Sequence, residues 1–269
     1  MLFQQNNTNE IEINRYPAPL PLADDASGFT IIQLSDFHLG FGRPEPLLNK
    51  AIELTLSLNP DLIVLTGDYV DSHSQQIPLV KSVFSPLRAP LGVYATYGNH
   101  DHRADPPVLK RILTDIGIQV LNNSAVPLPA GLWLVGIDDL YEGNPDIEAA
   151  LSEPPLDAPL IVLSHHPGMI RRLPDRPIVM LSGHTHGAQI RLSFPSPELV
   201  CWYHLRTRYV SGWYHLGQRH LYVNRGLGIT GLPFRYNCPS EIACFDFKPK
   251  EAPDRLDKKA ITEESLTVD

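Results

Sequence analysis

The stretch IVMLSGHTHGAQI (Ile178–Ile190) joins an apolar run of strand character to two closely spaced histidines. The run ends at Gly183, and His184 and His186 come next with one threonine between them. A single histidine at the end of a strand is more often a hydrogen-bonded residue than a metal ligand. The interpretation of this pair therefore depends on the residue types at the ends of the other apolar runs of the chain.

Similar apolar runs divide the first two thirds of the chain. Strands are predicted at 29–34, 61–66, 91–97, 132–137, 160–164 and 178–182, and helical spacing of apolar residues predicts helices at 45–58, 77–87 and 107–116. This alternation is typical of β-α-β units, in which parallel strands are joined by right-handed crossovers. Because the carboxyl ends of parallel strands meet at one edge, residues that follow different strands are expected to become neighbours.

The character of the chain changes after Gly187. β-branched and aromatic residues are frequent, and strands are predicted at 189–193, 220–224 and 241–247. The aromatic and basic stretch 201–222 leaves two alternatives open. We favour a hairpin that packs its aromatic residues onto the core, with a turn at 211–213; the other is a lid over a lipid or nucleoside group, or a contact with a membrane.

Five of the apolar runs end in side chains that bind metals, in the segments LSDFH, LTGD, TYGNHD, LSHH and LSGHTH. The donors are Asp36, His38, Asp68, Asn99, His165, His184 and His186. Carboxylate, imidazole and amide donors without a thiolate suit Mn, Fe or Zn rather than a closed structural zinc site. Seven donors are too many for one tetrahedral ion, so we predict two ions that share a carboxylate, an arrangement suited to displacement at phosphorus.

The ordered motifs DFH, GD, GNHD, SHH and GHTH resemble those of the calcineurin-like metallophosphoesterases, over residues 31 to about 187. The segment 221–242 is similar to one bacterial branch of that family, which contains small phosphodiesterases and pyrophosphatases, several of them associated with membranes. The resemblance implies an α/β fold with mixed α and β elements. Its form would be a four-layer α-β-β-α sandwich, two mixed sheets flanked by helices.

The resemblance also implies roles for individual residues. It assigns one metal to Asp36, His38, Asp68 and His186, and the other to Asp68, Asn99, His165 and His184. The Asp68 carboxylate would bridge the two ions, and a hydroxide between them would attack phosphorus without a covalent phosphoenzyme. His100 would be the catalytic histidine that contacts the phosphate or the leaving oxygen, and Asp101 would orient His100.

The predicted reaction is hydrolysis of a phosphodiester or pyrophosphate bond in a small molecule, such as a lipid precursor or a nucleotide. A phosphomonoesterase or protein phosphatase with the same metals remains an alternative, as does a binding protein that keeps the fold without catalysis. Arg43, Arg225 and Arg235 are candidates for binding substrate phosphate. Each is weighed evenly against the ordinary interpretation of an arginine as a surface residue.

Composition sets the remaining expectations. The chain has 269 residues and a net charge of -8, which argues against a nucleic-acid scaffold. Three cysteines without CxxC spacing favour a reducing compartment. With neither a signal peptide nor a membrane-spanning run in the sequence, we expect a cytoplasmic protein; peripheral contact at the inner face of the membrane and the oligomeric state stay open.

Three parts of the chain are expected. Residues 29–249 form the metallophosphoesterase domain. Residues 1–28 are an extended lead-in in which EIEI, at 10–13, adds a strand to a sheet edge, and 250–269 form a mobile charged tail.

Overall fold

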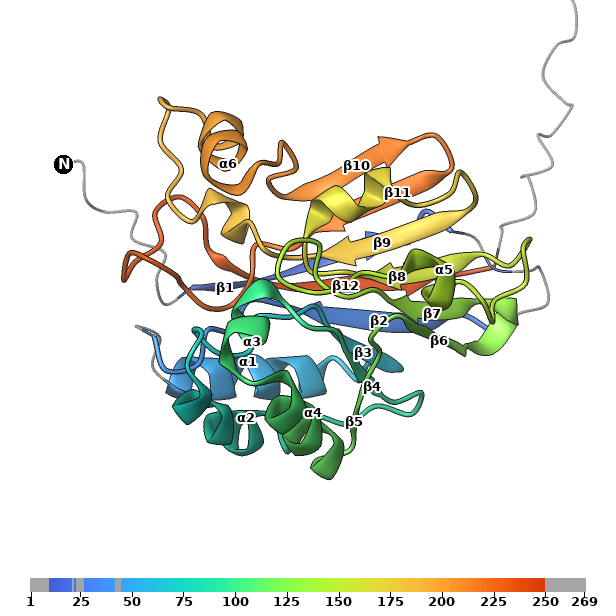
Figure 1. The fold of residues 1–269 in the computed structure, drawn as a ribbon, viewed down its shortest axis with the longest axis horizontal. Coiled ribbons are helices and arrows are strands. Elements are labelled where there is room, and N and C mark those ends of the chain that lie inside the picture. Colours follow the sequence, from blue (N-terminus) through green and yellow to red (C-terminus); the bar gives the residue numbers. More distant parts are fainter. Residues whose placement is uncertain (1–9, 21, 23–26, 42–44, 250–269) are drawn as a thin grey trace, which may run out of the picture.

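Two six-stranded sheets form the centre of the computed structural model, which describes residues 10–20, 22, 27–41 and 45–249 (Figure 1). The first sheet has the order β1 (Ile11–Pro17), β12 (Ser240–Phe247), β2 (Phe29–Leu34), β3 (Leu62–Leu65), β4 (Val93–Ala95), β5 (Ile118–Val120). The second has the order β10 (Gly212–Leu216), β11 (Arg219–Val223), β9 (Ile178–Ser182), β8 (Leu160–Leu163), β7 (Trp133–Gly136), β6 (Ser124–Pro127). Both sheets are mixed, because β12 runs antiparallel to β2, β10 to β11 and β6 to β7, whereas the other pairs are parallel.

Helices cover the outer faces of the two sheets (Figure 1). The first sheet is covered by α1 (Glu45–Ser57), α2 (Ile77–Phe84) and α4 (Pro106–Asp115), with α3 (Asn99–Ala104) at its edge. The second carries α5 (Ile147–Ala150) and the 3-10 turn η3 (Pro167–Arg171), whereas α6 (Pro197–Leu205) packs against the turn at His186–Ala188. Shorter 3-10 turns are η1 (Ser74–Gln76), η2 (Pro129–Gly131) and η4 (His186–Ala188). Two mixed sheets flanked by helices confirm the predicted fold class.

Alternating side chains place each strand between two apolar layers. Ile31 packs between the sheets whereas Ile32 packs under the helices, as expected from the two-residue period of a strand. Helix α1 buries Leu48, Ala51 and Ile52, the spacing of one helical face. The domain is therefore assembled by burial of apolar side chains on both faces of the first sheet.

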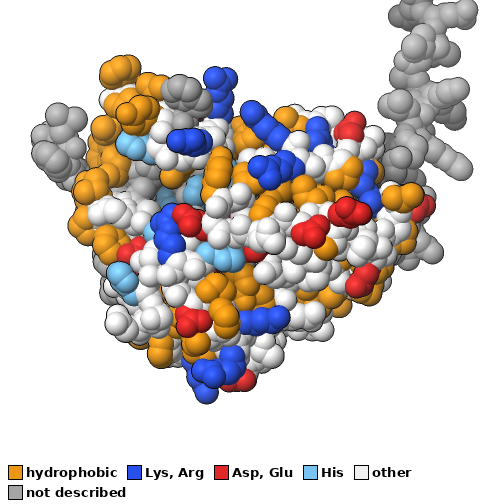
Figure 2. Space-filling view, in the orientation of Figure 1, with side chains coloured by type: hydrophobic (Ala, Val, Ile, Leu, Met, Phe, Trp, Pro, Cys, Tyr) orange, Lys and Arg blue, Asp and Glu red, His pale blue; other side chains and the backbone are white. Residues whose placement is uncertain are grey.

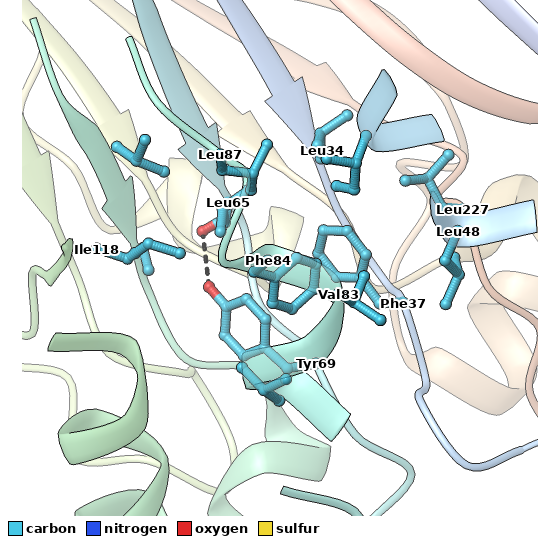
Figure 3. Close-up of a cluster of buried hydrophobic side chains, with 14 of the residues drawn as sticks. Leu34, Phe37, Leu48, Leu65, Tyr69, Val83, Phe84, Leu87, Ile118 and Leu227 are labelled. Carbon is cyan, nitrogen blue, oxygen red and sulfur yellow. Dashed lines mark hydrogen bonds between the residues drawn. The ribbon is translucent and has the colours of Figure 1, made fainter. Parts of the chain in front are cut away.

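An aromatic cluster holds the loops that follow β2 and β3 (Figure 3). Phe37 and Tyr69 are stacked with ring centroids 5.8 Å apart, and the Phe84 ring lies edge-on to Phe37 at 4.6 Å. The Tyr69 hydroxyl also donates to the Leu65 carbonyl oxygen at 3.2 Å. Because Phe37 and Tyr69 each stand next to a predicted metal ligand in sequence, burial of these rings fixes the ligand loops to the core.

Most predicted strands and helices are confirmed, including a strand at the amino-terminal edge, where β1 pairs with β12. The strand predicted at 189–193 is wrong: only Ile190 forms a bridge, with Tyr236. Gly187, Ala188 and Gln189 all have positive φ, which turns the chain away from the sheet. The tail 250–269 lies outside the described residues.

The hairpin predicted within 201–222 is only partly right. Its beginning, 201–205, belongs to α6, and its strands, β10 and β11, are joined at 217–218 rather than at 211–213. Strands β5, β6 and β10 were not predicted. Among the helices that the structure describes, none combines the length and the apolar character needed to cross a bilayer.

The aromatic cluster is expected to stabilise the fold. Phe84→Ala should lower the free energy of unfolding by about 3–5 kcal/mol, because it removes a buried ring and leaves a cavity beside Phe37 and Tyr69. Chemical denaturation measures the change. Leu156→Ala, at a side chain 92% exposed, is the control and should stay within about 0.5 kcal/mol of the parent. Equal effects of the two substitutions would contradict the role of the cluster.

Candidate metal centre

All seven predicted donors follow the carboxyl ends of parallel strands, and the structure brings them together. Asp36 and His38 follow β2, Asp68 follows β3 and Asn99 follows β4 in the first sheet. His165 follows β8, and His184 and His186 follow β9 in the second sheet. The two sheets thus contribute ligands to one site, as the convergence of strand ends predicts.

One group of donors lies around His38. Its Nε2 is 3.0 Å from His186 Nε2 and 3.5 Å from Asp68 Oδ2. His186 Nε2 is in turn 3.4 Å from Asp36 Oδ1. These four side chains are buried, and their spacing leaves room for a cation to be shared among them.

A second group lies on the other side of Asp68. Asp68 Oδ2 is 3.1 Å from His165 Nε2, which is 3.3 Å from His184 Nδ1. The His184 Nδ1 atom also lies 2.9 Å from Asn99 Oδ1. The two groups share Asp68, whose carboxylate stands between His38 and His165. The assignment of each group to one ion stays a prediction.

The hydrogen bonding of this cluster fits bound cations. His165 Nδ1 donates to the Thr66 carbonyl oxygen at 2.7 Å, and the other ring nitrogen, Nε2, faces Asp68 Oδ2 at 3.1 Å. Although burial opposes it, the carboxylates of Asp68 and Asp36 raise the pKa of His165 well above its usual value. Asp36 Oδ2 is buried without a hydrogen-bond partner. A positive charge among these atoms would satisfy them, and mixed N and O donors suit a transition metal.

Burial favours the neutral form of two of the histidine donors, His184 and His186. It lowers the pKa of both His184 and His186 well below the usual value, and neighbouring imidazoles act in the same direction. Neutral imidazole is the form that binds metals. The electrostatics of the cluster therefore favour ligation over protonation at these two positions.

The ligand-bearing loops have an uncommon backbone conformation. Positive φ angles of 52° at Asp36, 46° at His38, 56° at Asp68, 74° at His184 and 52° at His186 place these residues in the left-handed region. Each such residue costs roughly 1–2 kcal/mol for a side chain with Cβ. Strain of this kind persists where the surroundings over-determine it, and it is concentrated at functional sites.

Glycine is required where backbones approach the carboxylates. A Cβ at Gly183 would collide with the Asp36 carboxylate and with Ser35, and a Cβ at Gly98 would collide with Asp68. The sequence alone suggests that Gly183 serves the turn itself. The structure shows instead that its role is close approach, because there is no space for a side chain.

Asp101 does not orient His100, contrary to the prediction. Its carboxylate accepts hydrogen bonds from the backbone N–H groups of Asp68, Tyr69 and Gly98, at 2.8, 2.9 and 2.8 Å. It is the acidic residue in the first turn of α3, a pattern that reads in sequence as a helix cap. Asp101 therefore fixes the loop that carries Asp68.

The side-chain partner of His100 is Ser72, which the sequence interpretation missed. The Ser72 hydroxyl is 2.6 Å from His100 Nδ1, and Asp71 Oδ1 is 3.7 Å from the same atom. Asp71 Oδ1 also lies 3.2 Å from His38 Nδ1. The segment after Asp68 thus orients the rings of His100 and His38. In the sequence, this segment is distinguished only by polar residues near the end of a strand.

A pocket of about 420 Å³ opens above the donors. Asp68, Asn99, His100, His184 and His186 line it from the metal centre. The opposite side is formed by Arg103, Tyr141, Glu142, His204, Leu205, Arg206 and Thr230. Figure 2 shows histidine side chains on the face of the molecule that faces the viewer, beside basic side chains. The pocket is large enough for a phosphate ester to reach the cluster.

Of the three arginines predicted to bind substrate, the two that the structure describes do not line this pocket. Arg43 lies outside the described residues. Arg225 forms an ion pair with Glu12 at 2.6 Å and lines a separate pocket. Arg235 is buried and donates to the carbonyl oxygens of Gly228 and Arg225, so that it supports the loops behind the site. Arg225 is therefore engaged in ion pairs and Arg235 in hydrogen bonds to carbonyl oxygens, away from the pocket above the metal centre.

The aromatic residues of 201–222 are mainly part of the core, as the favoured alternative predicted. Trp213 packs edge-on against Tyr222, and Tyr209 against Tyr214, with centroids 5.1 and 5.0 Å apart. Tyr203 differs, because it is 73% exposed on α6. The side chain of Trp202 lies outside the described residues.

Comparison with known proteins agrees with this geometry. A family model described as calcineurin-like phosphoesterase matches residues 29–188. The metallophosphoesterase YkuE of Bacillus subtilis is 39% identical over 235 residues, which cover 82% of this chain and 79% of YkuE. Phosphodiesterase YaeI of Escherichia coli is 34% identical over 236 residues, which cover 83% of each chain. UDP-2,3-diacylglucosamine pyrophosphatase LpxG of Chlamydia trachomatis is 30% identical over 267 residues, which cover 75% of this chain and 78% of LpxG.

The hydrogen bonds of Asp101 are expected to stabilise the fold. Asp101→Asn exchanges one accepting oxygen for an amide that can only donate, which leaves a buried backbone N–H unpaired. The free energy of unfolding should fall by about 1–3 kcal/mol in thermal or chemical denaturation. Asp115→Asn, at an exposed position in α4, is the matched control. A variant with full stability but no turnover would instead support the original assignment of Asp101 to His100.

Proposed function

The chain belongs to the calcineurin-like phosphoesterase family, and from this premise we propose that it hydrolyses a phosphodiester or diphosphate bond in a small molecule with two transition-metal ions. The observation that carries the proposal is the position of Asp68. Its Oδ2 atom lies 3.5 Å from His38 Nε2 in one donor group and 3.1 Å from His165 Nε2 in the other. A carboxylate so placed can bridge two cations.

The residues assigned to each ion follow from the two groups. One ion would be held by Asp36, His38, Asp68 and His186, and the second by Asp68, Asn99, His165 and His184. Mn, Fe and Zn all suit imidazole, carboxylate and amide donors. When bound, such ions neutralise charge on the phosphate and activate a water molecule for attack on phosphorus.

The protein's own groups would position the substrate and handle its protons. The His100 ring lines the pocket, and its Nδ1 atom faces the Ser72 hydroxyl. This contact directs the other ring nitrogen towards the pocket, where it can donate to a phosphate oxygen or to the leaving oxygen. Asp71, near both His38 and His100, would keep the two rings oriented.

The substrate class is supported by relatives and by the pocket. YaeI is named a phosphodiesterase and LpxG a pyrophosphatase of a diacylated sugar nucleotide. Helix α6 lines the pocket with His204 and Leu205, while Leu199 and Tyr203 on the same helix are exposed. An apolar group on the substrate, or a membrane surface, could contact these side chains. The cytoplasmic location stays a prediction from the sequence.

Metal dependence and two substitutions test the proposal. Asp68→Asn removes the charge of the bridging carboxylate and His100→Ala removes the proton donor, so each should lower kcat/KM on bis(p-nitrophenyl) phosphate by about 100-fold or more. Chelation should abolish turnover, and added Mn²⁺ should restore it. His73→Ala is the control, because that exposed histidine lies outside the pocket. Full activity after exhaustive metal removal would overturn the proposal.

The same assay separates the alternatives. A higher kcat/KM on p-nitrophenyl phosphate than on the diester would identify a phosphomonoesterase. Metal binding with no turnover of diester, monoester or diphosphate would identify a binding protein on this fold.

A further inference from the structure

A second pocket, of about 460 Å³, adjoins the pocket above the metal centre. It is formed by the η3 turn, the loop after β7 and the segment that follows α6. We call it the arginine pocket, because Arg171, Arg206 and Arg208 are among its lining residues. The proposed hydrolytic reaction uses none of its three cations.

The two pockets are immediate neighbours. Tyr141 and Arg206 line both of them. The ring centroids of His166, in the arginine pocket, and His184, at the metal centre, are 4.5 Å apart. One small ligand can therefore occupy both pockets at once.

The charge of the arginine pocket suits an anion, and its three arginines are exposed at its surface. No carboxylate is among its lining residues, although the whole chain carries a net charge of -8. Arg171 is held in place by the Tyr209 hydroxyl, which accepts from its Nε atom at 3.2 Å. Within the described part of the chain, the guanidinium groups of Arg206 and Arg208 have no hydrogen-bond or ion-pair partner. Such donors are available to bind phosphate oxygens in a bidentate manner.

The backbone supports the same interpretation. Arg206 is the residue that ends α6, and its φ of 52° is a left-handed conformation in which glycine is usual. Thr207 is buried, and its hydroxyl accepts from the Tyr209 backbone N–H at 3.2 Å. This turn places the arginines on either side of Thr207 in one pocket. An arginine kept where glycine would cost less points to a role for its side chain.

We propose that the arginine pocket binds a second phosphate group of the substrate, so that the enzyme favours phosphate esters with two phosphates over those with one. This inference rests on the proposed function, since the other phosphate must lie at the metal centre. Two sources of the second phosphate share this chemistry. It can be the neighbouring phosphate of a diphosphate bond, or a separate phosphate elsewhere on a diester.

Matched substrates test the proposal on the metal-loaded, full-length protein. Bis(p-nitrophenyl) phosphate has one phosphate, and the diphosphate that joins the same two aryl groups has two. The third substrate is a phosphodiester of a ribose that carries a separate phosphate on another hydroxyl of the same ribose. Chromatography of the products gives kcat/KM for each.

The parent protein should favour at least one of the two-phosphate substrates. The preference is the ratio of kcat/KM on the two-phosphate substrate to kcat/KM on the one-phosphate diester. In the double variant Arg171→Gln/Arg208→Gln this ratio should fall about tenfold or more, mainly because KM for the two-phosphate substrate rises. Arg172→Gln is the matched control, because this exposed neighbour of Arg171 lines neither pocket, and it should leave the ratio unchanged. The two-phosphate substrate whose kcat/KM ratio falls in the double variant identifies the source of the second phosphate.

Binding provides a readout that does not depend on turnover. Calorimetry should show that the double variant loses about tenfold in affinity for methylenediphosphonate but not for methylphosphonate. An unchanged ratio and an unchanged diphosphonate affinity in the double variant would overturn the arginine pocket. A parent protein that hydrolyses none of the three substrates would instead contradict the proposed function, and the calorimetry would still decide on the pocket.

Discussion

Electrostatic crowding around the Asp68 carboxylate determines how the loops of the metal centre must be held. Imidazole nitrogens approach it from two sides, at 3.5 and 3.1 Å, in a buried site where a second carboxylate, Asp36, has an oxygen without a hydrogen-bond partner. Burying an unpaired charge costs free energy, because the charge loses its hydration. The surrounding fold must therefore hold the two carboxylates and the imidazoles in place. Cations among them would turn this cost into binding energy.

Residues next to the metal ligands fix the ligand loops to the core. Phe37 and Tyr69 anchor the loops of Asp36 and Asp68 in the aromatic cluster, and Asp101 accepts three backbone N–H groups from the Asp68 and Gly98 turns. Each sheet supplies only part of the site, so neither donor group is complete until the two sheets pack. Apolar burial between the sheets is thereby coupled to the assembly of the metal centre.

The strands and the proximity of the donors could be predicted because five apolar runs are followed within two residues by a His, Asp or Asn, and the carboxyl ends of parallel strands converge on one edge. The contacts of His100 could not, since Ser72 reaches it across a turn whose shape is set by left-handed residues such as Asp68. Helix α6 escaped prediction because its aromatic and apolar residues, which have strand propensity, form a short helix capped by Ser196. Arg235 was misplaced because sequence does not distinguish an arginine that binds substrate from one that is buried against carbonyl groups.

Anomalous X-ray diffraction from crystals of the Mn²⁺-loaded protein shows whether Asp68 bridges two ions. Two anomalous peaks per chain are expected, roughly 3.5–4 Å apart, one beside His38 and His186 and the other beside His165 and His184. A single peak, or two peaks that do not share Asp68, would contradict the bridging role of Asp68.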